Sequence, residues 1–204
     1  MREKNDTKTP LASSTGSSLR TTQERRKAFL EHYNPDSQWR LCRDPEDCVT
    51  GDHPTLAEVR KAYGENMSKA WLVPQLVDLS EFCGCRDKMD VRMLEQCAVV
   101  IDTEYPHLKI TDVMLFLHRF KAGHYGRFFG AVDPMLITSS LRRYLNDRAA
   151  IIERNEQRRR ERELERERAE MPPISWEEFR ERHGREGVDS PVDVFGANGL
   201  PNVK

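Results

Sequence analysis

A basic, aromatic and glycine-rich loop offers the clearest chemistry in this sequence. It covers residues 121–130 and reads KAGHYGRFFG. Lys121 and Arg127 carry charge that can neutralise phosphate, and glycines allow a backbone to approach a phosphate closely. Aromatic rings can stack on unpaired bases. The loop therefore predicts contact with a nucleic acid.

The candidate binding residues divide by their chemistry. Five side chains are predicted to contact phosphate, namely Lys121, His124, Arg127, Arg142 and Arg143. Three rings are candidates for stacking on bases, namely Tyr125, Phe128 and Phe129. The alternative is that these rings fold inward as part of the core while the cations are only solvated. The sequence leaves both interpretations open.

The charge of the chain is unevenly distributed. Residues 105–150 contain seven cations and three anions, a net charge of +4, whereas residues 54–104 contain six cations and nine anions, a net charge of −3. The whole chain has a formal net charge of −1. The net charge therefore implies no global electrostatic partner, and the basic character is local to residues 105–150.

Metal binding is not predicted. The cysteines number five, an odd count. Cys42, Cys48 and His53 lack the two-to-four-residue spacing of zinc knuckles, and so does the Cys83-Gly84-Cys85 run. Cys97 lies on an apolar helical face and is predicted to belong to the core. No metal and no cofactor are expected.

Catalytic residues are not predicted either. His118 and His124 lie near acidic residues in sequence, but no nucleophile motif, phosphate-cradling loop or paired-carboxylate signature accompanies them. Helix capping explains Thr111 and Asp112. The sequence therefore favours a non-enzymatic protein.

The elements that position the loop are predicted to be helices, so the fold class is mainly α. Thr55 and Glu58 form a capping box, and apolar residues at helical spacing follow up to Trp71. Gly64 is expected to weaken this helix and Pro74 to end or kink it. A second short helix is expected to run to residue 84.

Three more helices complete a predicted helical domain over residues 54–152. One covers residues 90–103. The next is expected to start at Thr111, its capping residue, and to stop at Gly123. The last starts at Asp133-Pro134, because an acidic cap followed by proline is typical of a helix start.

The remaining segments are polar. Residues 1–20 are expected to be disordered, and residues 21–53 to form a short helix, capped by Thr21 and Glu24, followed by a loop. Residues 153–170 predict a charged, solvated helix with one basic stripe of Arg154, Arg158, Arg162 and Arg166. Residues 171–204 are expected to be a flexible tail.

This tail is expected to contain a short helix, residues 176–183. Trp176 and Phe179 on this helix are candidate partner-binding residues, as in helix-in-groove recognition. The alternative is that the helix packs on its own domain. No signal peptide and no apolar run of membrane-spanning length is present, so a cytoplasmic location without a membrane partner is expected.

Four runs carry a resemblance to a known family: PTLAEVRKAYG (54–64), LVPQLVDLSEF (72–82), the stretch 105–134, and LRRYL (141–145). Residues 54–150 resemble an uncharacterised family from Bacteroidetes genomes and their phages or mobile elements. Its most specific part is the Lys-Ala-Gly-x-Tyr-Gly-x-Phe-Phe-Gly-x-x-Asp-Pro run. The layout of helical domain, charged helix and tail is also similar to that of phage helicase loaders. The family resemblance implies no activity.

The leading hypothesis is therefore a non-enzymatic accessory protein of DNA transactions, such as replication or helicase loading in a phage or mobile element. Its expected partners are DNA and a replication protein. The alternative hypothesis is a protein–protein adaptor with no nucleic-acid role, which uses the C-terminal helix as its partner ligand.

Overall fold

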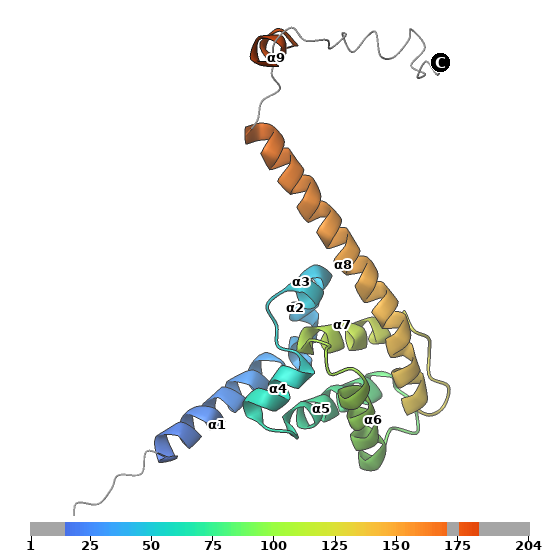
Figure 1. Cartoon of the computed structure of the whole chain (residues 1–204). Coiled ribbons are helices and arrows are strands. Elements are labelled where there is room, and N and C mark those ends of the chain that lie inside the picture. The colour runs from blue at the N-terminus through green and yellow to red at the C-terminus, as the bar shows by residue number, and fades with distance from the viewer. Residues whose placement is uncertain (1–14, 171–175, 184–204) are drawn as a thin grey trace, which may run out of the picture. The chain divides into compact units, whose positions relative to one another are not determined.

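The computed structural model describes residues 15–170 and 176–183, and these residues are mainly helical (Figure 1). Residues 1–14 and 184–204, where disorder was predicted, lie outside the described residues. The helices are α1 Thr15–His32, η1 Pro35–Ser37, α2 Gln38–Leu41, α3 Pro45–Thr50, α4 Leu56–Tyr63, α5 Met67–Phe82, α6 Val91–Glu104, α7 Ile110–Lys121, α8 Pro134–Glu170 and α9 Trp176–His183. The described segments contain isolated bridges but no named strand. The mainly α prediction is confirmed.

The first predicted helix ends earlier than expected. The capping box at its start is present, because Thr55 N donates to Glu58 Oε2 (2.7 Å) and Glu58 N donates to Thr55 Oγ1 (3.2 Å). Gly64 then has φ +110° and ψ 153°. That backbone region is open almost only to glycine, so Gly64 ends α4 rather than weakening it.

Pro74, in contrast, neither ends nor separates a helix. It lies inside α5, although it has no N–H to donate to the preceding turn. Trp71, Leu72 and Leu76 around it are buried. Tertiary packing of these side chains outweighs the lost hydrogen bond, so the prediction of a break at Pro74 was wrong.

The segment before residue 54 is structured and belongs to the core. Residues 34–54, predicted to be a loop, contain η1, α2 and α3. Asn34 and Asp44 cap η1 and α3 with their side chains. Five apolar side chains of this N-terminal part are buried, namely Phe29, Tyr33, Cys42, Cys48 and Val49. Polar turn residues therefore mark helix caps here, and not the absence of helix.

Hydrogen bonds fix this N-terminal part to α5. Trp71 Nε1 and Gln75 Nε2 both donate to the carbonyl oxygen of Tyr33, at 2.7 and 2.9 Å. Gln38 Nε2 donates to Gln75 Oε1 at 2.8 Å. All of these groups are buried, so each bond satisfies a donor or acceptor that would otherwise be costly. The folded unit thus includes residues that the sequence placed outside it.

The start of α1 also differs from the prediction. The helix runs from Thr15 to His32. Residues 15–20 were expected to be disordered, and Thr21 was expected to cap a helix. Because Thr21 lies in the second turn of α1, the proposed capping box with Glu24 does not begin the helix.

Helix α7 is the centre of the packing. It contacts α2, α3 and α5, and its residues 110–117 are all buried. Thr111 does not cap it, because Thr111 Oγ1 donates to the carbonyl oxygen of Cys48 (2.7 Å). Asp112 instead accepts from Lys109 N at 3.1 Å. The N-terminus of α7 is therefore joined to α3 by Thr111.

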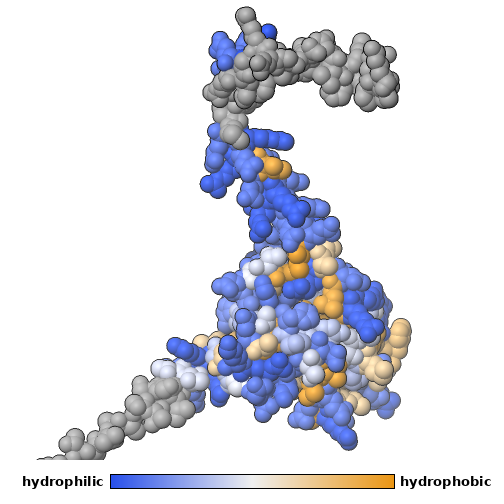
Figure 2. Space-filling view, in the orientation of Figure 1, coloured by the Kyte–Doolittle hydropathy of each residue, from blue (hydrophilic) through white to orange (hydrophobic). Residues whose placement is uncertain are grey.

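Helix α8 starts where the sequence predicted, at Pro134, after Asp133 Oδ1 accepts from Met135 N (2.8 Å). The chain divides into two units, Met1–Glu156 and Gln157–Lys204. In the second unit, residues 157–170 of α8 are all exposed, and the face shown in Figure 2 is almost entirely hydrophilic there. No helix in the described part of the chain is long and apolar enough to cross a bilayer.

Candidate nucleic-acid interface

The predicted basic loop connects α7 to α8, and its side chains differ in burial: Tyr125 is buried, Phe128 is half-buried, and His124, Arg127 and Phe129 are exposed. Gly126 has φ +115°, a conformation that residues with a Cβ rarely adopt. It separates Tyr125, which is buried, from Arg127, which is exposed. The sequence left open which of the three rings face inward. In the structure, some rings face inward and others are exposed.

Tyr125 belongs to the core and is not available for base stacking. Its ring packs against Phe116 and Phe120, with centroid distances of 5.4 and 6.0 Å. Its hydroxyl donates to Asp147 Oδ2 at 2.9 Å. Burial, together with the Asp147 carboxylate, raises the pKa of Tyr125 to about 12. For this ring the core alternative is correct.

Lys121 is engaged within the fold. Its ammonium group pairs with Asp78, donates to Gln38 Oε1 at 3.0 Å and lies 5.7 Å from the centroid of the Phe82 ring. Its side chain is only 15% exposed. The geometry therefore gives Lys121 a structural role in place of the predicted phosphate contact.

The two phenylalanines of the loop differ in exposure. Phe128 is half-buried and stacks on Phe120, with centroids 5.1 Å apart and an interplanar angle of 19°. Phe129 is 91% exposed, the largest exposed fraction among the large apolar side chains of the described residues. Phe129 is thus open to a ligand, whereas Phe128 offers only part of its ring.

Arg143 holds the loop against α8 while remaining exposed. Its guanidinium donates to the carbonyl oxygens of Tyr125 (3.3 Å) and His124 (3.2 Å) and lies 5.7 Å from the Tyr125 ring centroid. His124, Arg127 and Arg142 are exposed as well. We define the basic loop surface as His124, Arg127, Phe129, Arg142 and Arg143.

Two shallow hollows adjoin this loop. One, of about 300 Å³, is lined by Phe82, Arg127 and Phe128 among others. The second, of about 520 Å³, is lined by Trp39, Phe82 and His118 among others. Burial lowers the pKa of His118 below its usual value of 6.5, and the positive charges of Lys121, Arg119 and His124 lower it further. The neutral form of the His118 imidazole is therefore favoured.

Trp39 and Phe82 were missed as candidate site residues. Trp39 lies in a segment that was interpreted as a loop, and Phe82 follows the apolar pattern of a helix. Exposure is what distinguishes them, at 65% and 62%, and no pattern in the sequence carries that information.

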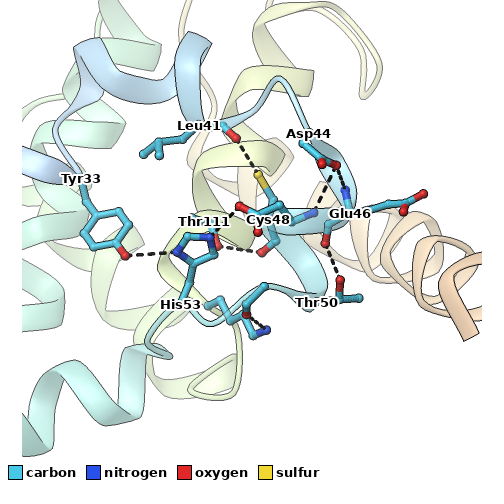
Figure 3. A network of polar contacts seen from close by, with 11 residues as sticks. Tyr33, Leu41, Asp44, Glu46, Cys48, Thr50, His53 and Thr111 are labelled. Atoms are coloured by element: carbon cyan, nitrogen blue, oxygen red, sulfur yellow. Dashed lines mark hydrogen bonds and ion pairs between the residues drawn. The ribbon is translucent and has the colours of Figure 1, made fainter. Parts of the chain in front are cut away.

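A second polar cluster lies between the N-terminal part and α7 (Figure 3). Tyr33 Oη and His53 Nδ1 are 3.2 Å apart, and His53 Nε2 lies 3.0 Å from Asp47 Oδ2. Burial raises the pKa of Tyr33. A buried phenol with a raised pKa is a poor nucleophile, so this array is better suited to joining α1 to the segment after α3.

The cysteines are dispersed between core and partly exposed positions. Cys42, Cys48 and Cys97 are buried, whereas Cys83 and Cys85 are partly exposed. Burial raises the pKa of Cys97 to about 12. Among the described residues, no three His, Cys, Asp or Glu side chains are grouped as a metal site would require.

The candidate partner-binding residues Trp176 and Phe179 belong to α9. Their side chains lie outside the part that the structure describes, so their role stays a prediction.

One family match covers part of the chain. Residues 88–185 match the model of a family of unknown function, DUF6633. The matched stretch includes α6, α7, the loop with the basic loop surface, α8 and α9. No curated protein and no solved structure matches the chain. The match thus extends over the candidate site but says nothing of its activity.

Proposed function

We propose that this protein is a non-enzymatic accessory protein of DNA transactions that binds nucleic acid through the basic loop surface. The observation that carries the proposal is the arrangement around Phe129. This ring is 91% exposed, and Arg127, two residues earlier, is exposed as well. An exposed ring close to unpaired cations is the combination that binds bases and phosphates together.

Each of the three anions in residues 105–150 has a partner other than Arg127 and Arg142. Asp112 accepts from Arg148, Asp147 accepts from Tyr125 and pairs with Arg119, and Asp133 caps α8. No carboxylate pairs with Arg127 or Arg142 among the described residues.

The number of exposed cations sets the expected strength. Three arginines and one histidine can neutralise only a few phosphates. Affinity without sequence specificity should then lie in the range of roughly 10⁻⁴ to 10⁻⁶ M at physiological salt and should weaken as salt rises.

The proposed setting is replication or helicase loading in a phage or mobile element, with a replication protein as the second partner. Its support is the resemblance of residues 54–150 to an uncharacterised family of Bacteroidetes and their mobile elements. The basic loop surface itself requires only a polyanion and is tested independently of that setting.

The experiment is fluorescence anisotropy with the full chain and labelled DNA over a series of salt concentrations. The test variant combines Arg127→Ala with Arg142→Ala. It should bind more weakly, and the slope of log affinity against log salt should fall by about 0.9 for each lost contact. Lys121 is left unchanged because its loss would also break the pair with Asp78.

The matched control combines Lys61→Ala with Arg92→Ala, two exposed cations on α4 and α6. It removes the same charge from elsewhere and should bind like the wild type. If both double variants bound DNA equally weakly, the loss of affinity would come from the lower net charge and not from the basic loop surface. Absence of binding by the wild type at low salt would reject the proposal and favour the protein–protein adaptor.

A further inference from the structure

We propose that the nucleic acid is single-stranded and that its bases stack in an aromatic groove formed by Trp39, Phe82 and Phe128. This inference rests on the proposed function and extends it, since it adds a second surface and selects the form of the nucleic acid. None of the three residues belongs to the basic loop surface.

Three elements of the fold contribute to the groove. Trp39 comes from α2, Phe82 from the last turn of α5, and Phe128 from the loop after α7. Trp39 and Phe82 line the hollow of about 520 Å³, and Phe82 and Phe128 line that of about 300 Å³. Phe82, Lys121 and Ala122 line both hollows, so the two hollows are adjacent.

Two of the three rings contact neighbouring side chains, and all three remain at least partly exposed. Phe128 has Phe120 stacked against it at a centroid distance of 5.1 Å. Phe82 has the Lys121 ammonium 5.7 Å from its centroid but remains 62% exposed. Trp39 is 65% exposed. Large exposed apolar side chains that gather in one place mark an interaction site, because isolated chains gain nothing by exposing them.

The distribution of charge fits a nucleic-acid strand. Lys121 is neutralised by Asp78, so the middle of the groove presents little charge. Arg127 lines the same hollow as Phe82 and Phe128 and belongs to the basic loop surface. Bases can therefore stack on the rings while phosphates lie at the Arg127 end. Asp36 lines the Trp39 end, which disfavours a phosphate there.

Only an unpaired strand can use such a groove. In a duplex, base faces are covered by their neighbours, whereas bases of a single strand can be splayed out and stacked on aromatic side chains. His118 also lines the hollow beside Trp39. As a neutral imidazole it can donate one hydrogen bond and accept another, which suits the edge of an unpaired base.

The test compares an oligothymidylate of about 16 nucleotides with a duplex of equal length, using the full chain. The variants are Trp39→Ala and Phe82→Ala. The control is Met93→Ala, which removes a 43% exposed apolar side chain from α6. The wild type should prefer the oligothymidylate, and each ring variant should weaken that binding by roughly 5- to 150-fold. The control and duplex binding should be unchanged.

Two readouts locate the strand directly. Trp39 emission in a Trp176→Phe background should be quenched by oligothymidylate, since Trp71 is 1% exposed and shielded. Cys83 lines the hollow of Phe82 and Phe128, so bound oligothymidylate should slow its alkylation. Cys85, which does not line the hollow, serves as the internal control.

The outcomes separate the inference from the proposed function. Equal affinity for single strand and duplex, with neutral ring variants, would overturn the inference and leave the function standing. No binding of either would overturn both. If the ring variants bound oligothymidylate normally but no longer bound a protein partner, the groove would be a site for an apolar peptide. That result would also overturn the inference.

Discussion

Asp112 is the residue on which the junction of α7 and α8 depends. Its carboxylate is fully buried and accepts hydrogen bonds from Tyr144 Oη (2.6 Å), Arg148 Nε (3.1 Å) and Lys109 N (3.1 Å). The basic loop lies between these two helices. The buried Asp112 carboxylate thus holds α7 and α8 in the arrangement that exposes the cations of the basic loop surface.

Replacement of Asp112 by Ala should destabilise the protein strongly. The change leaves Arg148, whose side chain is 21% exposed, without its partner, and breaking a buried pair costs about 3 kcal/mol. Tyr144→Phe removes one hydrogen bond and should cost about 1 kcal/mol. Urea denaturation measures both. The control Glu95→Ala, on an exposed position, should change stability by less than about 0.5 kcal/mol; a similar small effect of Asp112→Ala would contradict the assignment.

His118 should make stability depend on pH. Its pKa is lowered in the folded protein, chiefly by burial and then by nearby cations. The unfolded chain therefore binds the proton more tightly, and stability falls as pH falls below 6.5. Between about pH 7.5 and about pH 5.5, the wild type should lose more stability than His118→Gln. Parallel curves of thermal midpoint against pH for the two proteins would show that His118 contributes nothing.

At the scale of elements, the boundary between α4 and α5 depends on one backbone conformation. Gly64 has a φ of +110°, and Pro74 lies within the next helix. An added Cβ at Gly64 would meet only Arg26 Nη2, at 3.5 Å, so the cost of a side chain there is conformational.

Substitutions at these two positions should have opposite effects. Gly64→Ala should destabilise by about 1–3 kcal/mol, because alanine rarely adopts this φ and ψ. Pro74→Ala should stabilise, because α5 regains an N–H donor to the carbonyl oxygen of Ala70. Chemical denaturation of both variants is the measurement. If the helix instead continued through Gly64 and broke at Pro74, Gly64→Ala would stabilise the protein and Pro74→Ala would destabilise it.

The basic loop is an element in which one residue step changes the role of a side chain. Tyr125, Lys121 and Phe128 face the protein to different degrees, while Arg127 and Phe129 are exposed. Sequence composition identified this loop, but it could not tell which of its cations and rings are free to contact phosphates and bases. Packing separates the side chains that face the protein from those that are exposed, because the loop covers the end of α7 and also connects to α8.

For the whole molecule, the minimal folded unit should include the N-terminal helices. Residues 21–156 contain every buried hydrophobic side chain of the described core. Residues 54–156 lack Phe29, Tyr33, Cys48 and Val49, and they leave the Trp71 and Gln75 donors unpaired.

The longer fragment should therefore unfold cooperatively, and the shorter one should not. With Trp39→Phe in the longer fragment, Trp71 is the only tryptophan in both fragments. Its emission should then shift to the red in the 54–156 fragment, where its covering residues are absent. Circular dichroism during urea titration gives an independent measure. Equal stability of the two fragments would restore the domain boundary that the sequence predicted at residue 54.

The sequence by itself determined the helical class, the capping box at Thr55, the start of α8 at Asp133-Pro134 and the location of a basic, aromatic loop. These features depend on neighbours close in the chain, where periodicity and capping chemistry act. Only the tertiary structure decided that Gly64, and not Pro74, separates two helices. It also decided that Lys121 pairs with Asp78 and that Tyr125 is buried. The physical reason is that burial and pairing depend on residues such as Gln38, Asp78 and Asp147, which contact the loop only after the chain has folded.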